Sequence, residues 1–164
     1  MIWGVDPASK SVALFGHDGY MAQCHKITVP KTDRGKELRG LRAELEYWLG
    51  LDENPIVFCE EPVLAGARNI RSTILIAETV GMVLSQHCPV YLVPVSSWKK
   101  GTVGNGNASK DQVAEWLRKE HPDLSSLCGS DQDLVDAATI CLYGSAVSNR
   151  SMDLGGRGNS HSRT

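Results

Sequence analysis

Apolar and polar residues follow two different spacings along this chain, and the change comes near residue 32. Before that point, three short apolar runs, MIWGVD, SVALFG and YMAQCHKITV, are separated by the turn-forming sequences DPASK and HDG. Short apolar runs bounded by Gly, Pro, Asp and Ser are typical of strands joined by tight turns. The N-terminal segment therefore predicts an antiparallel meander of three strands.

Helical spacing begins after Thr32 and then alternates with short, continuous apolar runs. Thr32 or Asp33 can cap a first helix, in which four apolar residues recur at helical spacing: Leu38, Leu41, Leu45 and Trp48. Asn69 can cap a second helix that runs to about Gln86 and is apolar on most sides, so it is expected to be buried on more than one face. Each helix is followed by an apolar run, IVFC and VYLVP, of the kind found in buried parallel strands.

The last third of the chain predicts two further helices. The stretch SSWKKGTVGNGNASK, residues 96–110, is expected to be a glycine-rich connection. One helix is predicted from Asp111 to about Glu120, and the apolar run from Leu134 to Leu142 predicts a second, buried one. Taken in order, the elements predict an α/β fold with a mixed five-stranded sheet, three antiparallel strands and then parallel strands, flanked by helices.

Composition limits the class of protein. The 164 residues are 41% hydrophobic and 22% charged, as in ordinary soluble globular proteins. We expect one domain over residues 1–150 and a polar, glycine-rich tail over 151–164. The five cysteines are widely spaced and form no CxxC pair, which argues against a disulfide framework and a zinc site. No apolar run has transmembrane length and the N-terminus lacks the features of a signal peptide, so we expect a cytoplasmic protein without a membrane partner.

Four carboxylates stand where apolar elements carry or end in an acid. Asp6 ends the first strand and Glu60 ends the IVFC strand, while Asp133 and Asp136 are three residues apart and share a face of the last helix. Strand ends on one sheet edge can lie side by side, and a helix packed there can add the other two acids. Clustered carboxylates repel one another unless a cation is present, and oxygen ligands without His or Cys suit Mg²⁺ or Mn²⁺. A metal ion would therefore compensate the charge of Asp136 inside an apolar helix.

Each acid also has an ordinary structural interpretation. Ser130 and Asp133 fit a capping box that only closes the helix start, and Asp6 precedes Pro7 in a turn. Glu60 could belong to a solvated strand end. Asp136 fits such an interpretation least, because it is neither a cap nor on a polar face.

Four stretches resemble the motifs of RuvC-type Holliday junction resolvases, members of the RNase H-like superfamily. They are WGVDPASKSVALFG, VFCEEP, WKKGTVGNGNASKDQV and DLVDAA, which occur in family order over residues 1–147. Two positions depart from the family. Ala8 stands where the family usually has Gly, and Pro62-Val63-Leu64 stands where typical members place an aromatic wedge. Either Val63 or Leu64 takes that role, or the wedge is absent.

The resemblance implies a metal-dependent endodeoxyribonuclease that resolves four-way junctions by paired symmetric nicks in recombination and repair. Its RNase H-like fold would hold two Mg²⁺ ions, for which Mn²⁺ can substitute, on Asp6, Glu60, Asp133 and Asp136. Lys110 would be catalytic and would contact DNA phosphate together with Lys99. We expect a homodimer on branched DNA, with the apolar helix Ile70 to Leu84 as its interface.

The distribution of charged residues is compatible with DNA binding, although the net charge of the chain is not. The net charge is −2, which is not the signature of a nucleic-acid binder. Basic residues nevertheless gather in two places that we expect to contact DNA: Lys99, Lys100 and Lys110 in the glycine-rich connection, and Arg68 and Arg71 at the start of the long helix.

Three other functions remain to be weighed. A different RNase H-like nuclease, acting on RNA–DNA hybrids or on branched or flap DNA, would share the carboxylates. A non-catalytic junction-binding protein would not need all four acids. A sugar-kinase or actin-like ATPase, which the sequence GVDPASKSVAL also resembles, pairs two such domains, and 164 residues are too few for that.

Overall fold

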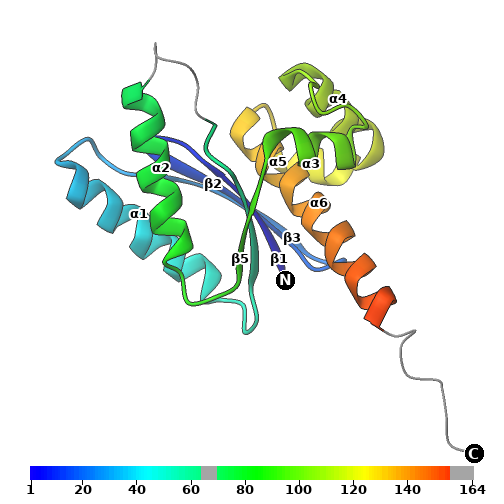
Figure 1. Ribbon diagram of the computed structural model, residues 1–164, viewed down its shortest axis with the longest axis horizontal. Coiled ribbons are helices and arrows are strands. Elements are labelled where there is room, and N and C mark those ends of the chain that lie inside the picture. The colour runs from blue at the N-terminus through cyan, green and yellow to red at the C-terminus, as the bar shows by residue number, and fades with distance from the viewer. Residues whose placement is uncertain (64–69, 156–164) are drawn as a thin grey trace, which may run out of the picture.

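Five strands form one mixed sheet in the order β3-β2-β1-β4-β5 in the computed structural model, which describes residues 1–63 and 70–155 (Figure 1). β1 pairs antiparallel with β2, and β2 pairs antiparallel with β3. β4 pairs parallel with β1, and β5 pairs parallel with β4. The strand bounds are Ile2–Pro7, Ser11–His17, Ala22–Thr28, Ile56–Glu60 and Val90–Val93 for β1 to β5. The predicted fold class is confirmed.

Helices cover both faces of the sheet (Figure 1). One face carries α1 (Arg34–Leu49) and α2 (Ile70–Leu84), and the other carries α3 (Val95–Thr102), α4 (Lys110–Glu120), α5 (Pro122–Cys128) and α6 (Gln132–Gly155). The side chain of Asp33 accepts the Lys36 N–H and caps α1, one of the two caps predicted. Asn69, the predicted cap of α2, lies outside the described residues. None of the helices in the described part of the chain is long and apolar enough to cross a membrane.

Alternation along the strands builds a separate core on each face. On β2, Val12 and Leu14 pack in the core under α1 and α2, whereas Ala13 and Phe15 pack in the core under α3 to α6. The sheet therefore has two apolar faces. Strands β1, β2 and β4 are mostly buried, whereas β5, which was also predicted to be buried, leaves Tyr91 and Leu92 54% and 38% exposed because it lies at the edge of the sheet.

Helix α6 lies directly against β1 because Gly4 has no side chain. A Cβ atom at Gly4 would overlap the carbonyl oxygen of Ala137 and would lie 2.9 Å from the Cβ of Cys141. The close approach places the N-terminal half of α6 across the central strand of the sheet.

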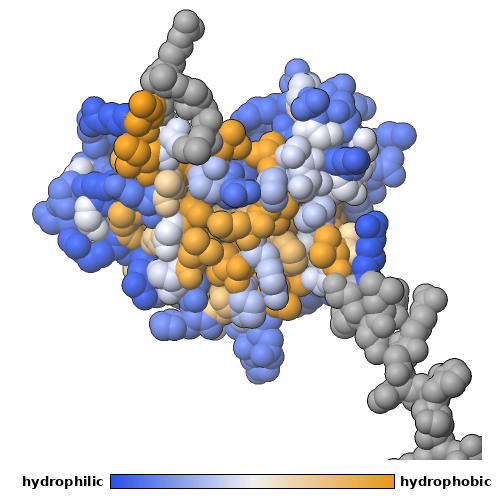
Figure 2. All heavy atoms as spheres, viewed as in Figure 1, coloured by the Kyte–Doolittle hydropathy of each residue, from blue (hydrophilic) through white to orange (hydrophobic). Residues whose placement is uncertain are grey.

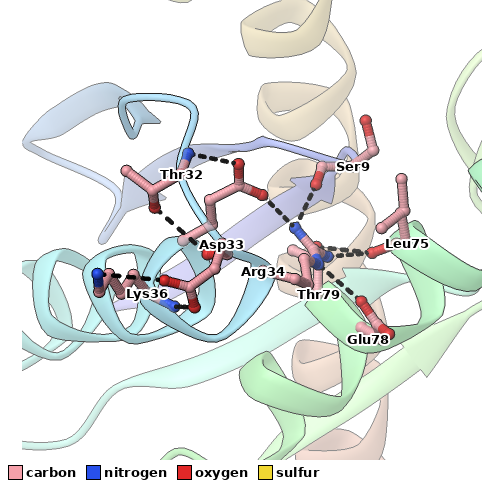
Figure 3. Close-up of polar contacts among 9 residues, drawn as sticks. Ser9, Thr32, Asp33, Arg34, Lys36, Leu75, Glu78 and Thr79 are labelled. Carbon is pink, nitrogen blue, oxygen red and sulfur yellow. Dashed lines mark hydrogen bonds and ion pairs between the residues drawn. The ribbon is translucent and has the colours of Figure 1, made fainter.

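Arg34 joins three elements at one end of the sheet (Figure 3). Its guanidinium donates to the Ser9 carbonyl oxygen at 2.6 Å, to the Leu75 carbonyl oxygen at 2.5 Å and to Thr79 Oγ1 at 3.0 Å. Ser9 belongs to the turn that follows β1, so α1 and α2 together hold the segment next to Asp6.

Three further features differ from the prediction. The first half of the connection over residues 96–110 is helical, because α3 spans Val95–Thr102 around the fully buried Trp98, and tertiary packing outweighs a sequence rich in Ser and Gly. The short helix α5 was not predicted. Helix α6 continues to Gly155 and so extends past residue 151, where we expected the tail to begin.

Candidate active site

Asp6 and Glu60 lie at the same edge of the sheet because β1 and β4 run parallel and side by side. The register pairs Val5 with Cys59, and Asp6 and Glu60 come next on their strands. Trp98 Nε1 on α3 donates a hydrogen bond of 3.0 Å to Glu60 Oε2.

Helix α6 adds Asp136 to this edge. Asp136 is only 8% exposed, and two side chains compensate the burial of its carboxylate. Gln132 Nε2, one turn earlier, donates to Oδ1 at 3.0 Å, and Lys110 Nζ, at the start of α4, lies 4.0 Å from Oδ2. Burial raises the pKa of Asp136, and these two partners oppose the shift.

The raised pKa values of Asp6 and Glu60 show that these acids interact electrostatically with one another and with Asp136. Burial is the largest cause that raises the pKa of Asp6 well above its usual value, and repulsion from Glu60, Asp136 and Asp133 follows in that order. Burial also raises the pKa of Glu60, where the Trp98 hydrogen bond opposes the shift and repulsion from Asp136 adds to it. Several carboxylates at one partly dry site favour either shared protons or a cation.

Asp133 faces a different partner from the other acids. Its Oδ2 lies 2.9 Å from Nζ of Lys26 on β3, and Lys26 also contacts Asp131 at 2.7 Å. The start of α6 is closed by Asp131, whose Oδ1 accepts the N–H groups of Asp133 and Leu134 at 3.0 and 3.3 Å. Asp131 therefore makes the cap that was assigned to Ser130 and Asp133, and the Asp133 carboxylate is not the capping group.

The donor set has the chemistry that a hard divalent cation needs, since it consists of carboxylates with raised pKa values at one sheet edge. Within residues 1–63 and 70–155, however, no three His, Cys, Asp or Glu side chains are arranged so that they could hold a metal ion together. Glu60, Asp133 and Asp136 are each held by a neighbouring donor: Trp98, Lys26 and Gln132 respectively. The residues fit a metal ion by type, and binding requires that some of these contacts be exchanged.

The basic residues are distributed differently from the prediction. Lys99 and Lys100 lie on α3 and Lys110 begins α4, so the three do not share one loop. Lys99 Nζ donates to the Ala108 carbonyl oxygen at 2.7 Å, and its charge acts on both Glu60 and Asp136. Lys100 is exposed on α3. Because successive residues of a helix point about 100° apart, its side chain leaves the helix in a different direction from that of Lys99.

The other predicted DNA contacts and the wedge lie at the segment between β4 and α2. Arg71 is exposed at the start of α2, and Val63 is 61% exposed after β4. Arg68 and Leu64 lie outside the described residues.

Sequence reasoning missed three residues that touch the site. Gln132 could have been found, because it stands one helical turn before Asp136. Trp98 was visible only as an aromatic residue beside two lysines. Lys26 gives no local signal, since it is 105 residues from Asp131 and meets it only through the packing of β3 against the start of α6.

A sheet in the order β3-β2-β1-β4-β5, with the first three strands antiparallel and the others parallel to β1, is the RNase H-like fold, here with acids at the ends of the central strand β1 and its neighbour β4. Among solved structures, the chain is similar to RuvC of Thermus thermophilus in complex with a Holliday junction substrate, with a TM-score of 0.69 and 21% identity over 92% of this chain and 95% of that chain. A second structure of Thermus thermophilus RuvC has a TM-score of 0.68 and 18% identity over 92% of this chain and 96% of that chain.

The fowlpox virus resolvase, in complex with its substrate Holliday junction DNA, is also similar, with a TM-score of 0.50 and 12% identity over 90% of this chain and 99% of that chain. No protein-family model matches the sequence, and no curated protein matches it. The expected likeness to RuvC-type resolvases is thus confirmed for the fold, which extends over almost the whole of both chains.

Proposed function

We propose that the protein is a divalent-metal-dependent endonuclease that resolves four-way DNA junctions by paired symmetric nicks in recombination and repair. The observation that carries the proposal is the position of Asp6 and Glu60 at the ends of adjacent parallel strands, where both interact electrostatically with Asp136 of α6, in a fold like that of RuvC. We expect Asp133, which contacts Lys26, to complete the ligand set. The RuvC and fowlpox structures were solved with Holliday junction DNA, which supports the same substrate class here.

Asp6, Glu60, Asp133 and Asp136 would hold Mg²⁺ or Mn²⁺, two ions to a site. Such ions, when bound, activate water and stabilise the leaving oxygen of a phosphodiester. The chain's own contribution is to place carboxylates where their charge is poorly solvated, so that a cation is bound strongly. Burial and mutual repulsion, which raise the pKa of Asp6, are the physical source of that affinity.

Lys110 and Lys99 would bind the DNA phosphate beside the acids. Lys110 begins α4, where the helix dipole also attracts a phosphate although a Ser109–Gln112 capping box closes the helix start, and its side chain is 65% exposed. Lys99 is anchored on the Ala108 carbonyl oxygen, which fixes its ammonium near Glu60. With Lys100, Arg68 and Arg71, they would form the phosphate-binding surface, and we expect junction affinity to fall as salt rises.

A junction with near two-fold symmetry is matched by a symmetric dimer. Helix α2 is our candidate for the dimer interface, because Ile70 and Ile74 are 58% and 53% exposed. Figure 2 shows apolar side chains at the surface where Figure 1 places the first turns of α2.

The test is an assay with an end-labelled four-way junction, a matched duplex and an RNA–DNA hybrid, each incubated with Mg²⁺. Wild type is expected to nick the junction alone, at symmetric positions, and Asp6→Asn is expected to lose at least about 100-fold in rate, since the negative charge of a proposed metal ligand is removed. Lys119→Gln, a charge change at the far end of α4, serves as the control.

Other outcomes favour the other functions. Cleavage of the hybrid would assign the protein to a different class of RNase H-like nuclease. Tight junction binding without cleavage in Mg²⁺ or Mn²⁺ would contradict the enzymatic proposal and leave a junction-binding protein.

A further inference from the structure

Lys26 lies against the site carboxylate of Asp133, as Lys110 lies against that of Asp136. Nζ of Lys26 lies 2.9 Å from Asp133 Oδ2 and 2.7 and 3.0 Å from the two carboxylate oxygens of Asp131. The three side chains are each about one-third exposed, so the contacts are partly shielded from water. The contact joins strand β3 to the first turn of α6.

We propose that Lys26 sets the affinity of the site for its divalent ion by holding Asp133 until the ion is bound. This inference rests on the proposed metal-dependent function and identifies a positioning residue of the same site. Among the described residues, no three acidic side chains are arranged to hold an ion, and the contact between Lys26 and Asp133 is one of those that would have to be exchanged. Two of the site acids lie against a lysine, and the contact of Asp133 Oδ2 with Lys26 Nζ, at 2.9 Å, is shorter than the 4.0 Å between Asp136 Oδ2 and Lys110 Nζ.

The exchange is made easy by the second partner of Lys26. When Asp133 turns to a divalent ion, Lys26 keeps both of its contacts with Asp131, so the ammonium is not left unpaired. Asp131 is itself fixed, because its Oδ1 accepts two N–H groups at the start of α6. Lys26 can therefore release Asp133 without a rearrangement of the helix.

A purely structural role for Lys26 predicts a different result. If the contact only ties β3 to α6, its loss lowers the melting temperature and leaves metal affinity unchanged or weaker. If Lys26 competes with the ion, its loss tightens metal binding. The direction of the change in affinity separates the two roles.

The experiment is calorimetric titration of Mn²⁺ into the full chain without DNA. We expect Lys26→Gln to tighten the dissociation constant about two- to fivefold, the range that partly exposed ion pairs correspond to. Lys26→Arg keeps the positive charge and should bind Mn²⁺ like wild type. Lys119→Gln is the matched control, because Lys119 pairs with Glu120 and lies nine residues, about 13 Å, along α4 from Lys110.

A second comparison tests whether Lys26 acts through Asp133. In an Asp133→Asn background, Lys26→Gln should no longer change the Mn²⁺ affinity, because the competition has been removed. An unchanged or weaker affinity in Lys26→Gln, an equal shift in Lys119→Gln, or a shift that persists beside Asp133→Asn would each overturn the proposal.

Failure of the proposed function gives a different pattern. If wild type shows no Mn²⁺ binding, or only binding that persists in Asp6→Asn, the metal site itself is refuted and this inference with it. If wild type binds Mn²⁺ and cuts junctions but Lys26→Gln does not tighten binding, only the role of Lys26 is refuted.

Discussion

Asp6 is the residue whose surroundings show most clearly what the site costs the fold. It is half-buried at the end of β1, repulsion from three other carboxylates adds to the effect of burial on its pKa, and Lys110 is the cation whose charge lowers that raised pKa. Acids whose pKa is higher in the folded than in the unfolded state bind more protons when folded. Their destabilising effect is absent below the usual value of 3.8 and grows as pH rises through the raised pKa.

The prediction at the scale of the residue follows from the direction in which the pKa of Asp6 is shifted. In the presence of a chelator, the stability of wild type should fall as pH rises from about 4 to 7, and Asp6→Asn should flatten this dependence. At pH 7 the variant should be more stable by about 0.5–2 kcal/mol, the usual size of a stabilising substitution. Urea unfolding at several pH values measures this, and Mg²⁺ should stabilise wild type more than the variant. A variant less stable than wild type at pH 7 would contradict the prediction.

At the scale of elements, the site depends on how closely α6 approaches β1. Gly4 permits that approach, and Ala137, which a Cβ at Gly4 would strike, is the neighbour of Asp136 in the sequence. The position of the Asp136 carboxylate is therefore set by a glycine on another element. Arg34 acts in the same way at the turn after β1, where it fixes the carbonyl oxygen of Ser9.

The element-scale prediction is that Gly4→Ala lowers both stability and activity. Overlap with backbone atoms of α6 should cost about 3 kcal/mol, at the upper end of overpacked cores, and should displace Asp136. Gly81→Ala on α2 is the matched control, since an added Cβ there meets nothing within 4 Å and should raise stability by about 1 kcal/mol. Thermal unfolding and junction cleavage measure both; a Gly4→Ala protein as stable as wild type would refute the close-packing argument.

At the scale of the whole molecule, two features are not explained within one chain. Helix α2 buries Thr79, Val80, Met82 and Val83 but leaves Ile70 and Ile74 exposed. The proposed substrate also has two strands to be cut, which one site does not reach at once. A dimer through α2 would account for both.

The whole-molecule prediction concerns that dimer. Ile74→Glu should weaken dimerisation by about tenfold or more, because a charge would be buried without a partner at the interface. Sedimentation velocity over a range of concentrations measures the change. Tyr20→Glu, at a residue 97% exposed in the turn between β2 and β3, is the control that should leave association unchanged. A wild-type chain that remains monomeric would exclude the proposed interface.

The sequence by itself determined the strands, the sheet class and the place of the four acids on their elements. Apolar periodicity is a local property, so the runs ending in Asp6 and Glu60 and the apolar helix around Asp136 could be recognised from their own residues. It did not determine α3 or α5, whose residues are helical because Trp98 and Cys128 are buried against other elements. Local propensity is weak in short segments, and tertiary packing decides them.

Only the tertiary structure decided which partners the acids have. The contacts of Lys26 with Asp133 and of Trp98 with Glu60 join residues far apart in the chain, and no spacing rule predicts them. Both Ser130 and Asp131 are residue types that can cap a helix, so the sequence alone does not decide between them. The side-chain geometry shows that Asp131 caps α6. Side-chain partners across elements are set by how the strands and helices pack. The places of the four acids on their strands and helix could therefore be recognised in the sequence, whereas their hydrogen-bond and ion-pair partners could not.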